Sequence, residues 1–116
     1  MAKLKGTLTN INEILGPVPI VGYWNGGVCV QYGTGGSGTV VLEVTADDVD
    51  TIDKIPLAQW TAIQMKNPND IAGAPISSLA AAGLGVADIV AYRGVRIRKS
   101  VAGTGGVDVT LVVGVG

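Results

Sequence analysis

The sequence predicts an all-β fold, a single-domain antiparallel β-sandwich that is jelly-roll-like and carries an extended N-terminal arm. Three observations support this prediction. The chain has 116 residues, which suits one domain. Apolar residues make up 47% and charged residues 15%, so the chain can bury a core. Its 18 glycines and five prolines disfavour long helices and favour many tight turns.

Strands are indicated by apolar residues that alternate with polar or outward-facing ones. Val95 and Ile97 are expected on one face of a strand, and Arg96 and Arg98 on the other. The segments at 28–32 and 40–46 flank a glycine-rich turn and predict a hairpin. Short segments separated by Gly, Pro, Asn and Asp predict a sandwich or small barrel, with the further strands expected at 60–65, 86–92, 94–99 and 107–113.

In two segments the residue types themselves indicate the backbone conformation. Pro17-Val18-Pro19 restricts φ, so residues 1–21 are predicted to form an extended N-terminal arm or edge strand, with the sandwich domain at 22–116. Residues 77–82 (SSLAAA) have helix propensity, but a helix this short is unstable by itself. Strand or irregular structure is therefore favoured there, with one helical turn as the alternative.

The composition argues against several classes of function. The chain has no histidine, which removes the usual general base and the commonest metal ligand, so we expect no enzyme, cofactor or metal site. A net charge of −1 argues against nucleic-acid binding. No apolar run is long enough to span a membrane, and no secretory leader is expected. Cys29 lies in an apolar run and is expected to act as a small hydrophobe.

Two motifs are similar to ligand-binding patterns, one for phosphate and one for a cation. Residues 33–38 read G-x-G-x-x-G, but the segment that follows is a strand, so no helix N-terminus is available to hold a phosphate. Four acids between Asp47 and Asp53 suit a hard cation, yet Ile52 breaks the calcium-loop pattern. A solvated loop is favoured at 47–53, and ion binding there is left open.

A cluster of cations at 93–99 has two interpretations of equal weight. It forms either a solvated sheet face or a contact surface whose arginines bind carboxylates, such as those at 47–53 of another copy. Trp24 has glycine-rich flanks and is a candidate for docking, whereas Trp60 is expected to anchor the core. The residues predicted to lie at an interface are Ile14, Val18, Ile20, Trp24, Arg96 and Arg98.

Four segments within residues 28–113 follow one another in an order that resembles a known group of proteins. Gly38–Val44 (GTVVLEV) is followed by Trp60-Thr61, by Ala91–Arg98 (AYRGVRIR) and by Gly106–Leu111 (GVDVTL). Together they resemble the small β-sandwich structural proteins of tailed bacteriophage virions, of the capsid decoration or cement type.

This resemblance implies a non-enzymatic virion structural protein, made in the bacterial host cytoplasm and located on the capsid surface. The expected role is to stabilise the head by bridging capsid subunits. The expected partners are the major capsid protein and copies of this chain, with a homotrimer as one arrangement. The alternatives are a tail, baseplate or fibre-attachment protein, or a carbohydrate-binding β-sandwich, which the five aromatic residues disfavour.

Overall fold

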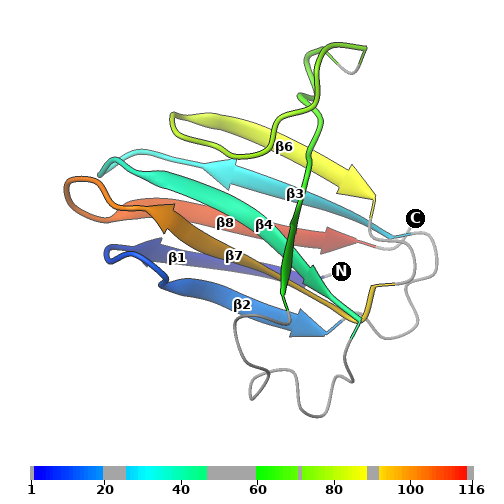
Figure 1. The fold of residues 1–116 in the computed structure, drawn as a ribbon, viewed down its shortest axis with the longest axis horizontal. Coiled ribbons are helices and arrows are strands. Elements are labelled where there is room, and N and C mark those ends of the chain that lie inside the picture. The colour runs from blue at the N-terminus through cyan, green and yellow to red at the C-terminus, as the bar shows by residue number, and fades with distance from the viewer. Residues whose placement is uncertain (1, 20–25, 47–59, 71, 89–91, 115–116) are drawn as a thin grey trace.

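Two four-stranded antiparallel sheets pack face to face (Figure 1). The computed structural model describes residues 2–19, 26–46, 60–70, 72–88 and 92–114. One sheet has the order β1-β8-β3-β6 and the other β2-β7-β4-β5. The predicted all-β sandwich is confirmed, and its strands are β1 Ala2–Leu8, β2 Ile14–Pro19, β3 Gly27–Tyr32, β4 Thr39–Thr45, β5 Thr61–Ile63, β6 Gly83–Asp88, β7 Gly94–Val101 and β8 Val107–Gly114.

The topology is that of one long hairpin rolled into a jelly roll. Strand β1 pairs with β8, β2 with β7, β3 with β6 and β4 with β5, and all four pairs are antiparallel. Two further pairs, β3 with β8 and β4 with β7, complete the sheets. The predicted hairpin between residues 28–32 and 40–46 is therefore wrong, because β3 and β4 belong to different sheets. Alternation identifies a strand without identifying its partner.

The core lies between the sheets and follows the predicted alternation. Val95 and Ile97 of β7 point inward with fully buried side chains. The same holds for the stripe along β8, which includes Val107 and Leu111. The inward residues of β3 and β4 complete this aliphatic core: Val28, Val30, Tyr32, Val40, Leu42 and Val44. At one end of the core, the Tyr32 hydroxyl donates to the Gly38 carbonyl at 2.7 Å.

The N-terminal residues 2–8 and 14–19 lie within the sandwich, one strand at an edge of each sheet. Strand β1 pairs with β8 from Ala2↔Val113 to Leu8↔Val107. The turn between β1 and β2 is held by a buried lysine, since Nζ of Lys99 donates to the Leu8 and Thr9 carbonyls at 3.3 and 2.9 Å. These contacts join the N-terminal segment to both sheets, and residues 20 and 21 lie outside the described part.

The two Gly-Thr-Gly-Gly segments of the sequence pack against one another. The Ser37 amide donates to the Thr104 carbonyl at 2.9 Å, and the Thr104 amide donates to Ser37 Oγ at 2.8 Å. A Cβ added to Gly36 would come 2.6 Å from the Gly106 carbonyl oxygen. The repeat is therefore explained by the close approach of two turns, and the predicted absence of a helix after residues 33–38 is confirmed.

Residues 61–79 join the edges of both sheets on the side opposite β1 and β2. Strand β5 pairs with β4, and Leu79 exchanges two backbone hydrogen bonds of 2.9 Å with Val40. Lys66 and Val86 of β6 do the same, at 2.7 and 2.9 Å. Residues 77–82 are irregular, as favoured from the sequence. The described residues include no helix that could cross a membrane.

Candidate functional site

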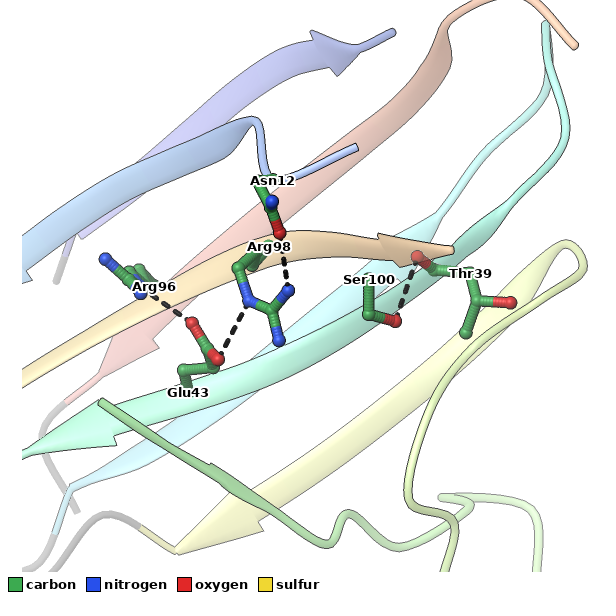
Figure 2. Close-up of polar contacts among 6 residues, drawn as sticks. All are labelled: Asn12, Thr39, Glu43, Arg96, Arg98 and Ser100. Carbon is green, nitrogen blue, oxygen red and sulfur yellow. Dashed lines mark hydrogen bonds and ion pairs between the residues drawn. The ribbon is translucent and has the colours of Figure 1, made fainter. Parts of the chain in front are cut away.

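A buried ionic cluster lies on the outward face of β4 and β7 (Figure 2). Oε1 of Glu43 accepts from Nε of Arg96 at 2.8 Å, and Oε2 accepts from Nε of Arg98 at 2.9 Å. Nη1 of Arg98 also donates to Oδ1 of Asn12, on the turn between β1 and β2, at 2.9 Å. Beside the cluster, Oγ of Ser100 donates to the Thr39 carbonyl at 3.4 Å. One carboxylate thus links two arginines of the neighbouring strand.

The position of the cluster follows from strand alternation and register. Glu43 is the register partner of Arg96, and all three charged residues occupy outward positions between inward-facing buried residues. The guanidinium of Arg96 stacks over the ring of Trp60, with 4.2 Å from Cζ to the ring centroid. Glu43 and Arg96 are only 3% and 4% exposed. Removal of the single carboxylate would therefore leave buried positive charge uncompensated.

Two buried side-chain polar atoms within the described residues have no hydrogen-bond partner. They are Nε1 of Trp60 and Nη2 of Arg96, two donors of the same cluster. The cluster thus has one carboxylate for two guanidinium groups and retains unused donors. Its chemistry favours a further acceptor, such as a water oxygen or a carboxylate.

The structure changes the interpretation of the cation cluster. In one of the two interpretations, Arg96 and Arg98 bind carboxylates of another copy, but Glu43 of the same chain binds both. Arg96 is buried, so the prediction that it forms an exposed contact is corrected. Lys99 faces the opposite side of β7 and is fully buried, whereas Arg93 is exposed. The four cations therefore do not share one surface, because strand alternation separates them.

The other residues predicted at an interface lie in different environments. Val18 is 6% exposed and belongs to the core, so its side chain is not available to a partner. Ile14 is 38% exposed on β2. Ile20, Trp24 and the acidic segment 47–53 lie outside the described residues. Trp60 is buried, yet it packs on Arg96 of the outward face and is not part of the central core cluster.

The outward face of the β1-β8-β3-β6 sheet has an apolar area on β3, β6 and β8, which the sequence analysis did not predict as a contact surface. Cys29 lies between Val86 of β6 and Val112 of β8 in the register, and Leu84 nearby is 41% exposed. A pocket of about 620 Å³ opens beside Cys29, with Ile63, Tyr92 and the other sheet-end residues in its lining. The available signal was the pair of apolar residues, Val86 and Val112, at outward positions.

No group of three or more His, Cys, Asp or Glu side chains within the described ranges could hold a metal ion. Burial raises the pKa of the Cys29 thiol, which makes it a poor nucleophile near neutral pH. Neither of the two unpartnered buried donors lines the pocket. The pocket can accommodate an apolar group, and its lining includes the Cys29 thiol.

Comparison with known proteins identifies a similar fold and no family. No family model matches the sequence. No curated protein matches it significantly. A solved structure, that of SPBc2 prophage-derived protein YomS, is similar with a TM-score of 0.64 and 19% sequence identity. The match covers 97% of this chain and 93% of that chain. The similarity therefore extends over the whole jelly roll.

Proposed function

We propose that this chain is a non-enzymatic structural protein of a bacteriophage virion, and that it decorates the capsid and stabilises it by bridging capsid subunits. The observation that carries the proposal is the full-length likeness of its jelly roll to a prophage-derived protein. The order of sequence segments that resembles virion β-sandwich proteins supports the same class. A fold by itself does not determine function, which depends on the surfaces that the sandwich presents.

The physical form of the molecule suits a bridging role. Its principal extents are 36 × 35 × 22 Å, so it is a slab with two broad faces. Part of one face is formed by the half-buried residues Cys29, Val86 and Val112, with Leu84 exposed, and this part is suited to apolar contact. On the other face the charged groups of Glu43, Arg96 and Arg98 bind one another. Repeated on a symmetric shell, weak contacts of such a slab add up to tight attachment.

The test uses phage heads that lack this protein. The purified protein is added back, and binding is followed by co-sedimentation and by the melting temperature of the shell. We expect the protein to sediment with heads and to raise the temperature at which they melt. Unchanged shell melting with the protein bound would argue against a stabilising role, and failure to bind heads would remove the capsid assignment.

Two variants sharpen this test. Leu84→Glu introduces charge on the apolar face, whereas Val101→Glu does so at another exposed apolar residue, at the end of β7. If the apolar face is the contact, only Leu84→Glu should lose attachment. A cysteine at the exposed Ala74, in a Cys29→Ser background, allows gold labelling for electron microscopy. Label confined to the tail would support the tail or baseplate alternative instead.

A further inference from the structure

The four edge strands of the sandwich differ in their capacity to accept another strand. Strand β2 contains Pro17 and Pro19, which have no N–H, and its register shifts between Leu15 and Val18. Strand β5 has three residues. Strand β6 already exchanges hydrogen bonds at Val86 with Lys66. Strand β1 has seven residues, no proline and an unbroken register with β8, so it is the edge most suited to accept a strand.

The backbone groups of Lys3, Lys5 and Thr7 point away from β8. The Gly33 amide donates to the Asp108 carbonyl at 2.7 Å, so the backbone of Asp108 faces β3. Backbone direction alternates along a strand, so Val107, Val109, Leu111 and Val113 face β1. Their register partners are the even-numbered residues of β1. The odd-numbered residues therefore direct their N–H and C=O groups to the open edge.

The opposite edge of this sheet follows the same alternation. The backbone groups of Val86 point to the outer edge of β6, and they are hydrogen-bonded to Lys66. No comparable bond reaches the outward groups of Lys3, Lys5 or Thr7 from any described residue. These three residues thus present an unused ladder of donors and acceptors.

The side chains along this edge select what can pair with it. Lys3, Lys5 and Thr7 are exposed and lie on the outward face. In the antiparallel pairing of β1 with its own copy that uses the full strand, the ladder places Lys5 opposite Lys5, and like charges in register are unfavourable. A partner strand with acidic residues at alternate positions would instead place carboxylates beside both lysines. The charge pattern therefore disfavours a second copy and favours an acidic strand.

We propose that the open edge of β1 binds an extended segment of a partner protein by strand addition, and that this segment carries acidic side chains at alternate positions. Backbone hydrogen bonds to Lys3, Lys5 and Thr7 provide the affinity, and the two lysine side chains provide the selectivity. The proposal goes beyond the structural role and does not rest on it, because a partner in any particle or cell can supply such a strand.

The test uses the full chain and three synthetic peptides. The first has the sequence TEVEVT, the second has lysine in place of glutamate, and the third is TEVEVT with N-methyl groups on alternate backbone amides. Each is attached through a flexible Gly/Ser linker after the last residue of the chain. Strand β8, the last described strand, ends beside the start of β1, because Ala2 pairs with Val113. The linker raises the effective concentration into the millimolar range.

The readout is amide hydrogen exchange by NMR. In the untethered protein the amides of Lys3, Lys5 and Thr7 should exchange rapidly, and those of Leu4, Gly6 and Leu8 slowly. The acidic peptide should slow the three odd-numbered amides roughly tenfold more than the lysine peptide does, because its carboxylates attract Lys3 and Lys5 whereas lysine side chains repel them. The N-methylated peptide should give no protection.

Two variants complete the experiment. The double variant Lys3→Glu and Lys5→Glu should invert the preference between the acidic and lysine peptides, whereas Lys66→Glu, at an exposed lysine of the opposite side, should not. Equal protection by both charged peptides, equal protection by the N-methylated peptide, or no protection by any of them would each overturn the proposal. Protection in the untethered protein that increases with its own concentration would identify a second copy as the occupant and overturn it too.

Discussion

The sandwich ends in β5 and β6 on one side and in β1 and β2 on the other, and the two sides are protected differently. On the first side, residues 61–79 hydrogen-bond to β4 of one sheet and β6 of the other, which satisfies edge groups through main-chain contacts. On the second, β2 lacks donors at its prolines and β1 has lysines on an open ladder. Protection by pairing closes an edge to every partner, whereas protection by charge leaves it open to a complementary one.

The largest effect is expected when the open side is removed. Deletion of residues 1–8 removes one of the two strands that pair with β8, together with the buried side chain of Leu8. Burial of one such side chain contributes about 1.5–3 kcal/mol, and a domain of this size has about 5–15 kcal/mol of stability in total. We expect loss of cooperative urea unfolding, measured by circular dichroism. Cooperative unfolding of the shortened chain would show that the domain does not need β1 to fold.

A smaller loss is expected from the ionic cluster that connects the β2 side to the sheet. Glu43→Gln keeps the shape of the side chain but leaves Arg96 and Arg98 without their carboxylate. Because the group is buried, the free energy of unfolding should fall by about 3 kcal/mol. The matched control is Asp108→Asn at the exposed bond to Thr7 Oγ1 of β1, with an expected loss below about 1 kcal/mol. Equal losses would mean that burial does not distinguish the two carboxylates.

A pair of proline substitutions compares the two edges directly. Val86→Pro removes the amide that donates to the Lys66 carbonyl at 2.9 Å, and that carbonyl loses its partner. Lys5→Pro removes an amide that points to the open edge. We expect Val86→Pro to cost about 1–2 kcal/mol more than Lys5→Pro in urea unfolding. A larger cost for Lys5→Pro would show that the assigned backbone direction of β1 is incorrect.

The smallest effect concerns Cys29, on β3 between the two sides. Since burial raises the pKa of its thiol, the thiolate fraction at a given pH is lower in the folded protein than in the unfolded chain. Alkylation by iodoacetamide should therefore be slower when folded, and its pH profile should shift upward. The comparison is the same reaction in urea. A folded profile that coincides with the unfolded one would contradict this expectation.

Local patterns in the sequence were sufficient to locate most strands and the faces of β7 and β8. Val95 and Ile97 are buried and Arg96 and Arg98 are outward, as alternation predicted. The same alternation could not show that Arg96 is buried under Trp60, because that contact joins residues far apart in the chain. The sequence analysis grouped Lys99 with the arginines because it is close to them in the chain. Its position on β7, two residues after Ile97, places its side chain on the inward face. The candidate contact surfaces therefore needed the folded structure.

The sequence by itself determined the elements of the fold, which are many short strands, an aliphatic core and turns rich in glycine. These features depend on residues that are close together in the chain. Only the tertiary structure decided which strands pair, because hydrogen bonds between strands are made by backbone groups that every residue except proline carries alike. The pairing of β4 with β7 brings Glu43 to its own arginines. The pairing of β1 with β8 at the end of a sheet leaves one lysine-bearing edge without a partner among the described residues.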